Sequence, residues 1–429
     1  MRYLPIDSSL FVENRRRLSG MLKPKSLVIL HANDILPTNA DGTMGFRQNT
    51  DLFYLSGVDQ EETILLLFPE HPDEKIREVL FLRETNEQIA IWEGEKLTKE
   101  QARSTSGIQA IFWTHQFEAV FRNIVFEAEH VYLNTNEHTR NESLVQTREA
   151  RYVREFKEKY PLHQLQRLAP LMHYLRAIKQ PQELALLMQA CDITRTGFLR
   201  LLKFVKPGVA EYEIEAELLH EFVRGRSRGF AYQPIIASGA NACVLHYIQN
   251  NQLCQDGQVL LLDVAAEYAN YNADLTRSIP VNGRFTPRQR AVYDAVLRVF
   301  KAAKSMLVVG NLWDEYHVEV GKVMESELLG LGLITKEDIA KQDPDWPAYR
   351  KYFPHGTSHF LGLDVHDVGN KYRRFEAGMV FTCEPGIYIR EEGLGIRLEN
   401  DILITADGNK DLMEHIPIEA EEIEELMNA

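Results

Sequence analysis

An aspartate closes a strongly apolar run of this chain, and this placement constrains the fold more than any other feature. Residues 259–262 are Val-Leu-Leu-Leu, a run typical of a buried strand, and Asp263 follows them directly. Asp274 lies eleven positions later, in the next strand-like segment. If 267–272 forms a hairpin turn centred between positions 268 and 269, the two aspartates face each other across an antiparallel ladder. Such carboxylates need a neutralising partner, because burying an unpaired charge is costly.

A second pair of acidic residues follows the same rule further along the chain. Glu384 lies in the strand-like segment 380–386 and Glu399 in 395–401, at equal distances from a turn centred between positions 391 and 392. Like charges that face each other across a ladder destabilise a sheet. Two such pairs within apolar strands therefore predict one or two divalent cations between them.

The segment 354–367 supplies the imidazole groups that such metal sites usually contain. It holds His355, His359 and His366, interrupted by glycines that favour a strand or loop over a helix. Four carboxylates and one or two histidines suit manganese, cobalt or zinc better than copper. Taken singly, an aspartate at a strand end is usually a turn residue and a histidine a satisfied polar group. Together they predict a metal site and, from composition alone, a metal-dependent hydrolase, because two bridged metals activate a shared water.

Charge and cysteine usage exclude other classes of protein. The 429 residues include 48 Lys and Arg against 62 Asp and Glu, a net charge of −14 that disfavours nucleic acid as a partner. The basic runs 15–17 and 224–228 are interpreted as solvated faces. The four cysteines form no Cys-x-x-Cys pattern, which argues against a thiolate zinc site or a disulfide framework. With no signal-peptide or membrane-spanning pattern, we expect a cytoplasmic protein that has no membrane partner.

The pattern of apolar residues predicts two domains. Residues 1–170 alternate strand-like and helical segments, which indicates an α/β domain, and residues 171–429 begin with a helical pattern and continue as α+β. The second domain is expected to be built twice, each time as two helices followed by strands, and therefore to contain an internal pseudo-two-fold repeat. The expected helices are 181–204, 210–224, 287–310 and 313–329, and the expected strands are 258–265, 273–281, 379–389 and 396–404.

These motifs resemble the pita-bread metallopeptidases, in particular the branch that contains Xaa-Pro aminopeptidase (aminopeptidase P) and prolidase. The resemblance rests on the two aspartates at eleven-residue spacing and on the segments 354–367, 383–386 (CEPG) and 395–401 (GIRLEND). Residues 45–57 also resemble the start of that branch's N-terminal domain. The resemblance implies an α/β N-terminal domain over 1–170, similar to that of creatinase and aminopeptidase P, and an α+β pita-bread catalytic domain over 171–429.

The resemblance further implies which residues hold metal. Asp263, Asp274, His359, Glu384 and Glu399 would ligate two divalent ions, commonly manganese in this family, with zinc or cobalt as alternatives. Asp274 and Glu399 would bridge both ions, Asp263 would bind one, and His359 with Glu384 would bind the other. Glu384 would also take the proton from the bridging water.

Five further residues are implied in catalysis and substrate binding. His246 and His366 would contact the substrate or the tetrahedral intermediate, and His355 is a further catalytic candidate; a supporting or packing role remains the alternative for all three. Arg397 lies two residues before Glu399 and would hydrogen-bond ligand carboxylates, with Tyr232 as its network partner and a candidate substrate-binding residue.

The implied activity is removal of the N-terminal residue from peptides whose second residue is proline. Prolidase, which cleaves Xaa-Pro dipeptides, is the near alternative, because the sequence does not show whether the cleft is open beyond the proline. A catalytically inactive pita-bread binding module is an alternative of another class, and so is a non-metal enzyme of the creatinase type. Both lack this complete carboxylate set. Peptides are the expected partners, together with further copies of the chain in a homodimer or homotetramer.

Overall fold

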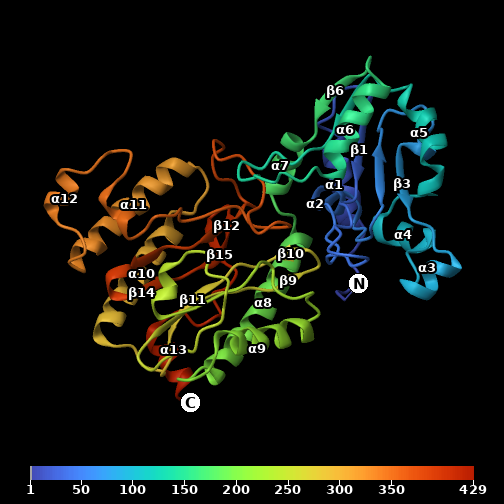
Figure 1. Ribbon diagram of the computed structural model, residues 1–429. Helices are drawn as coiled ribbons and strands as arrows, with labels where there is room; N and C mark the ends of the chain where they lie inside the picture. The colour runs from blue at the N-terminus through green and yellow to red at the C-terminus, as the bar shows by residue number, and fades with distance from the viewer. Residues whose placement is uncertain (1) are drawn as a thin grey trace. The chain divides into compact units, whose positions relative to one another are not determined.

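A computed structural model describes residues 2–429 of the chain (Figure 1). The chain divides into two compact units, which cover Tyr3–Arg176 and Ala177–Ala429. Among the described residues, no helix combines the length and the apolar character that a bilayer span requires.

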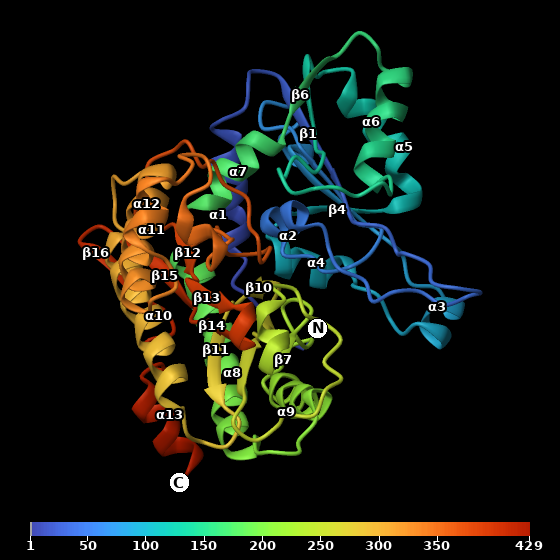
Figure 2. The same cartoon turned by 60° about the vertical axis from the view of Figure 1, so that its left-hand side comes forward.

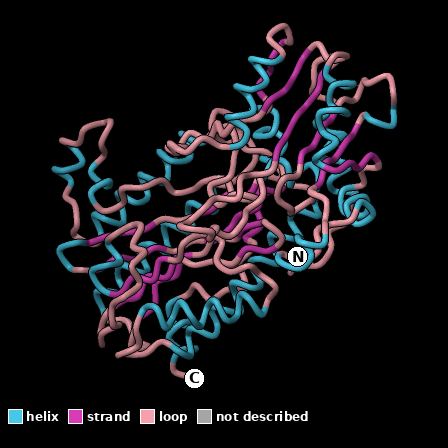
Figure 3. Tube along the Cα trace, turned by 45° about the vertical axis from the view of Figure 1, so that its right-hand side comes forward, coloured by secondary structure: helices cyan, strands magenta, loops and turns pink. Residues whose placement is uncertain are grey.

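The first unit is an α/β domain, as the sequence predicts. Its sheet has the strand order β4-β3-β2-β1-β5-β6, in which β2 is antiparallel to both neighbours and every other pair is parallel. Figure 3 shows these strands gathered in one sheet among the helices. The strands are β1 Ser26–His31, β2 Ile64–Leu67, β3 Glu78–Leu82, β4 Ala110–Trp113, β5 His130–Leu133 and β6 Gln164–Arg167. The helices are α1 Ser9–Ser19, α2 Thr50–Ser56, α3 Glu87–Trp92, α4 Lys99–Ser106, α5 Phe117–Val125, α6 Arg148–Lys159 and α7 Ala169–Ala177.

Two helix pairs frame the second unit. They are α8 Pro181–Phe204 with α9 Glu211–Arg224, and α10 Pro287–Met306 with α11 Trp313–Gly330. Proline stands in the first turn of α8 and of α10, where its missing N–H costs nothing, and the Thr286 side chain accepts from the backbone N–H of Gln289 to cap α10. Within each pair the helices pack together, and α10 also lies against β12 and β14 (Figure 2). Shorter helices are α12 Lys336–Ala340 and α13 Ala420–Met427.

Strands follow each helix pair, which gives the pseudo-two-fold repeat that the sequence predicts. The first set forms a sheet of order β11-β8-β7 and a short β9–β10 hairpin, and the second set forms a sheet of order β12-β15-β16 and a β13–β14 hairpin. Their bounds are β7 Ile235–Ser238, β8 Val259–Asp263, β9 Glu267–Tyr268, β10 Tyr271–Asn272, β11 Thr276–Pro280, β12 Val380–Cys383, β13 Gly386–Ile389, β14 Leu394–Arg397, β15 Asn400–Thr405 and β16 Gly408–Asp411. An isolated bridge between Thr276 and Glu399 joins the two sets.

The predicted register of the first acidic pair is wrong by two residues. Asp263 pairs with Thr276 and not with Asp274. The hairpin turns at Ala269 and Asn270, whose φ angles are 53° and 69°, so its centre lies one position later than predicted. Because side chains alternate with a period of two, the shift leaves both aspartates on the same face of the hairpin.

The predicted register of the second acidic pair is confirmed. Cys383 pairs with Asn400 and Gly386 with Arg397, and this common register sets Glu384 opposite Glu399 between the two ladders. The turn between β13 and β14 ends at Gly393, whose φ of 60° lies in the left-handed region that glycine tolerates.

Candidate metal centre

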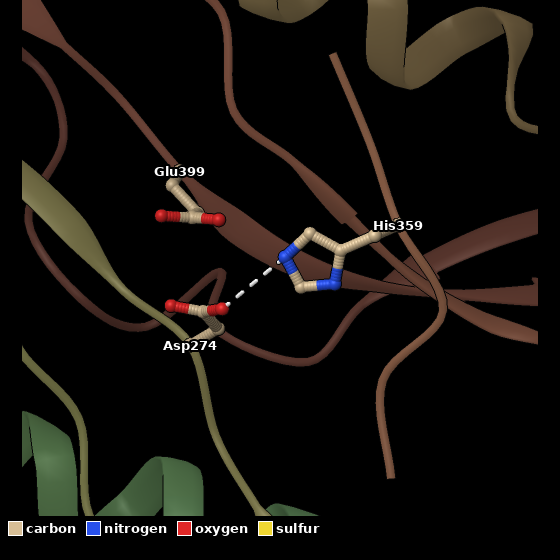
Figure 4. A group of neighbouring side chains, drawn as sticks. All are labelled: Asp274, His359 and Glu399. Carbon is tan, nitrogen blue, oxygen red and sulfur yellow. Dashed lines mark ion pairs between the residues drawn. The ribbon is translucent and has the colours of Figure 1, made fainter. Parts of the chain in front are cut away.

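Three of the predicted ligands meet in the second unit. One ligand atom each from Asp274, His359 and Glu399 lies within 4.8 Å of the others, and all three residues are buried. Nε2 of His359 is 3.5 Å from Oδ2 of Asp274. Figure 4 shows both carboxylates on the side of the imidazole that carries Nε2. Oxygen and nitrogen atoms this close together could ligate one divalent cation.

Glu384 joins this group from strand β12, which ends one residue earlier. Its Oε1 is 3.7 Å from Nε2 of His359. Its backbone N–H donates to the carbonyl of Thr357 at 2.8 Å, and the backbone N–H of His359 donates to Oγ1 of Thr382 at 3.1 Å. The histidine segment is therefore tied along β12, and this pairing brings His359 next to Glu384.

Asp263 reaches the other ligands through a chain of hydrogen bonds. Its Oδ1 accepts from Tyr232 at 2.6 Å and its Oδ2 from Arg397 at 2.5 Å. Nε of Arg397 donates to Oγ1 of Thr276 at 3.0 Å, and that hydroxyl donates to Oε2 of Glu399 at 2.6 Å. Arg397 and Tyr232 therefore both hold the carboxylate of Asp263, a predicted ligand, by direct hydrogen bonds.

The electrostatics of the group favour a cation. Burial raises the pKa of Glu384 to about 7, and burial with the neighbouring Asp274 raises the pKa of Glu399 well above its ordinary value. Burial also raises the pKa of Asp263, against the lowering effect of Arg397. For His359, burial lowers the pKa, but the hydrogen bond to Asp274 and the charge of Glu384 outweigh it and raise the pKa. Buried acids of this kind either keep protons or bind a metal, so the donor set fits divalent cations.

The predicted histidines outside the ligand set lie at different places. The His366 ring is 4.3 Å from the His359 ring between centroids, at an interplanar angle of 74°. Nδ1 of His355 is 3.7 Å from Oε2 of Glu384. His246 is exposed on the segment after the 3₁₀ helix η3 (Gly239–Cys243), and its charge is among those that lower the pKa of His355. The structure thus brings His355 and His366 close to the predicted ligands, and the side chains of His366 and His246 are both exposed to solvent.

His355 is held in its neutral form by its surroundings. Its Nδ1 is 2.8 Å from the carbonyl of Gly356, which assigns the ring proton to Nδ1. Nε2 then accepts from the Tyr388 hydroxyl at 2.8 Å, and that hydroxyl itself accepts from Arg397 at 2.8 Å. Burial, followed by the charge of Arg397, lowers the pKa of His355 to about 3.

Sequence reasoning missed three residues of the site, namely Thr276, Tyr388 and Asp401. Thr276 and Tyr388 make the hydrogen bonds described above, and Oδ2 of the buried Asp401 accepts from the backbone N–H of Asp274 at 3.2 Å. Thr276 and Asp401 each lie two positions after a predicted ligand in a strand-like segment of the sequence, so the period of two could have identified them. No comparable spacing points to Tyr388.

Comparison with known proteins finds relatives over the whole chain. Residues 185–406 match metallopeptidase family M24, and residues 11–132 match the aminopeptidase P N-terminal domain. The Xaa-Pro aminopeptidase of Haemophilus influenzae is 35% identical over 97% of each chain, and that of Escherichia coli is 33% identical over 98% of this chain and 97% of its own. Among solved structures, E. coli aminopeptidase P has a TM-score of 0.88 at 33% identity, and the aminopeptidase PepP of Pseudomonas aeruginosa has 0.89 at 30%. The E. coli structure covers 99% of both chains, and the P. aeruginosa structure covers 100% of this chain and 99% of its own.

Proposed function

Because the chain belongs to metallopeptidase family M24 and carries an aminopeptidase P N-terminal domain, we propose that it removes the N-terminal residue from peptides with proline in second place. Relatives named Xaa-Pro aminopeptidase match it along nearly its full length, which favours this activity over that of a prolidase. The observation that carries the proposal is the meeting of Asp274, His359 and Glu399 within 4.8 Å. We take residues 1–170 as the N-terminal domain and 171–429 as the catalytic domain.

Asp263, Asp274, His359, Glu384 and Glu399 hold two divalent ions in this proposal. When bound, the ions polarise the substrate carbonyl and lower the pKa of a shared water. Four carboxylates and one imidazole favour manganese, with zinc or cobalt as alternatives. A structure of the E. coli relative is described as zinc-substituted, which supports the view that this type of site tolerates more than one metal.

Glu384 is the proton carrier of the proposed reaction. Its carboxylate lies beside the other ligands, where it can accept a proton from the attacking water and return it to the leaving nitrogen. The return step matters because the nitrogen of the scissile bond must gain a proton to leave as an amine, and the proline nitrogen carries no hydrogen in the peptide. Glu384 and His355, 3.7 Å apart, lie together beside the ligands.

The histidines and Arg397 bind and orient in this proposal. His366, next to His359, donates a hydrogen bond to the oxygen of the attacked carbonyl, and the exposed His246 contacts the substrate from the solvent side. His355 stays neutral and supports Glu384. Arg397 and Tyr232 orient Asp263, and Tyr232 also borders the space that the substrate occupies.

The substitution Glu384→Gln tests the proposal. It keeps the size of the side chain but removes the proton acceptor and weakens one ligand, so turnover of an Xaa-Pro-Yaa tripeptide should fall by about 100-fold or more with the fold unchanged. Glu391→Gln, an exposed glutamate near the same hairpin, is the matched control and should leave turnover unchanged. Near-normal activity of Glu384→Gln would refute the assignment. Comparison with an Xaa-Pro dipeptide on the same enzyme separates the aminopeptidase from the prolidase.

Metal removal is a second test of the same proposal. A chelator should abolish turnover, and manganese should restore it more readily than magnesium because the site includes an imidazole. Full recovery with magnesium alone would contradict the ligand set.

We also propose that the protein is cytoplasmic and works as a homodimer or homotetramer. The oligomeric state rests on the resemblance to the family, and the location rests on the cysteine usage, which is typical of a reducing compartment. Light scattering on the purified full chain measures the oligomeric state, and a monomeric mass would overturn that part of the proposal.

A further inference from the structure

A buried ion pair lies against the histidine segment and outside the ligand set. Nζ of Lys179 is 2.9 Å from Oδ2 of Asp367, and both side chains are 1% exposed. Lys179 precedes the start of helix α8 by two residues, and Asp367 directly follows His366. Removing two charges from water is costly, so a pair of this kind is a weak source of stability and invites a different explanation.

The backbone of residues 360–367 folds closely over this pair. The N–H of Asp367 donates to the carbonyl of Phe360 at 2.8 Å, which closes the segment into a loop. A Cβ atom on Gly362 would come within 2.2 Å of Oδ2 of Asp367 and 2.8 Å of Nζ of Lys179. A side chain at position 362 would have to displace the ion pair. With glycine there, the backbone of the loop packs directly on the pair, which holds this side of the loop.

Asn272 fixes the other side of the same loop. Its Nδ2 donates to the carbonyl of Leu363 at 2.9 Å and to that of Gly362 at 3.2 Å, and its backbone N–H donates to Gly362 at 2.9 Å. Asn272 lies two residues before the ligand Asp274 on the β9–β10 hairpin segment. The loop is thus anchored both to the segment that precedes α8 and to the segment that carries the proposed metal ligand Asp274.

Lys179 also interacts with a second buried carboxylate. Burial raises the pKa of Glu183, and the charge of Lys179 opposes that rise. Oε2 of Glu183 accepts from the backbone N–H of Gln180 at 2.9 Å, and Oε1 accepts from Tyr271 at 3.2 Å. Loss of the lysine would leave Asp367 and Glu183 without their shared cation.

We propose that the Lys179–Asp367 ion pair and Asn272 are positioning residues that hold His366 against His359. His366 belongs to the anchored loop 360–367. Its side chain is exposed, and its ring centroid is 4.3 Å from that of His359. The inference rests on the proposed peptidase function, in which His366 donates to the attacked carbonyl. A displacement of about 1 Å at such a donor can lower turnover about 100-fold, so anchors away from the chemistry have a large effect on rate.

The first test is steady-state kinetics on the manganese-loaded full chain. Lys179→Met should lower kcat by about 10- to 100-fold with a small change in KM and with unchanged manganese content, because no ligand is altered. Asn272→Ala, which leaves no buried charge, should lower kcat in the same direction by a smaller factor. Arg176→Met is the matched control: it breaks the buried Arg176–Asp51 pair of the first unit, with side chains 3% and 13% exposed, and should keep kcat.

A double variant distinguishes an effect on the position of His366 from a general loss of stability. Lys179→Met/Asp367→Asn removes both charges of the pair, so it should regain part of the thermal stability lost in Lys179→Met, while Glu183 still lacks the cation and kcat stays low. Wild-type kcat in the folded, metal-loaded forms of Lys179→Met and Asn272→Ala would overturn the inference.

A spectroscopic readout keeps the inference independent of activity. Imidazole ¹H–¹⁵N spectra of the zinc-loaded protein, labelled at histidine, should show a displaced His366 resonance in Lys179→Met and Asn272→Ala but not in Arg176→Met. An unmoved His366 resonance would refute the positioning role. If the wild-type protein failed to cleave Xaa-Pro peptides, the proposed function would fall, and the His366 spectra would still decide the positioning claim.

Discussion

Thr276 links several groups of the metal centre through one hydroxyl. It donates to Oε2 of Glu399 at 2.6 Å and accepts from Arg397 at 3.0 Å, and Arg397 in turn holds Asp263. Thr276→Val keeps the shape of the side chain and removes these bonds. Residues that orient metal ligands typically contribute about 10- to 100-fold to metal affinity, so manganese affinity should fall by that factor with the fold intact.

Isothermal titration of the chelator-treated protein with manganese measures the effect. Thr405→Val, the same change at the end of β15, is the control and should leave the affinity unchanged. Equal affinities for Thr276→Val and the wild type would show that Glu399 is oriented by its strand alone.

At the residue scale, the sequence identified groups whose chemistry conflicts with their surroundings. Asp263 after four apolar residues and Glu384 within the apolar, strand-like segment 380–386 stand out, because a buried charge requires an explanation. Thr276 and Tyr388 do not stand out, since threonine and tyrosine are ordinary strand residues that fit a half-buried pleated surface. Their roles follow only from the contacts of the folded chain.

At the element scale, strand β14 packs so closely on the 3₁₀ helix η3 that Gly395 has no room for a side chain. A Cβ atom there would lie 2.3 Å from the carbonyl oxygen of Ala242. Gly395→Ala must push η3, and with it the His246 segment, away from the strand. Overpacking of this kind costs about 1–3 kcal/mol, so the free energy of unfolding and kcat/KM should both fall.

Urea unfolding and tripeptide turnover check this prediction. Gly330→Ala at the end of α11, where a Cβ atom meets nothing within 4 Å, is the matched control and should be neutral or stabilising. A Gly395→Ala variant as stable and active as the control would mean that η3 moves freely.

The two acidic hairpins show where prediction of elements succeeds and where it fails. The second register could be predicted because Gly393 follows the turn that the sequence placed at 391–392. The first failed by two residues because Ala269 and Asn270 both adopt positive φ, which alanine rarely does and which composition does not reveal. Strands β4 and β6 are four residues each, and so short a segment carries little periodicity from which to predict a strand.

At the scale of the whole molecule, the order of elements was predictable because two helices and a set of strands occur twice. Each repeat has its own helix caps and apolar runs, so long segments of the sequence all indicate the same order of elements. The proposed metal ligands come from both repeats: Asp263 and Asp274 from the first, Glu384 and Glu399 from the second. The folding of the second unit and its metal binding are therefore linked.

This linkage predicts how stability responds to pH and metal. A carboxyl whose pKa is raised in the folded state binds its proton more tightly there than in the unfolded chain. The pKa of Glu384 is about 7 in the fold against an ordinary 4.5. Its protonation therefore stabilises the metal-free fold fully at acid pH, and this stabilisation is lost as the pH rises through about 7. Glu399 and Asp263 shift in the same direction. Bound cations compensate the carboxylates, so the stabilisation by metal should increase as the pH rises.

Calorimetry of chelator-treated protein at pH 5.5 and pH 7.5, with and without manganese, measures this response. A ligand at 100 times its Kd adds about 2.7 kcal/mol, which corresponds to a rise in Tm of roughly 5–10 °C for a unit of this size. We expect a rise of that order at pH 7.5 and a smaller one at pH 5.5, where protons compete for the same oxygens. In Glu384→Gln the difference between the two pH values should shrink, because one titrating ligand is gone. An equal rise in Tm at both pH values would show that these carboxyl groups hold no protons in the metal-free fold, and the electrostatic argument for the site would then fail.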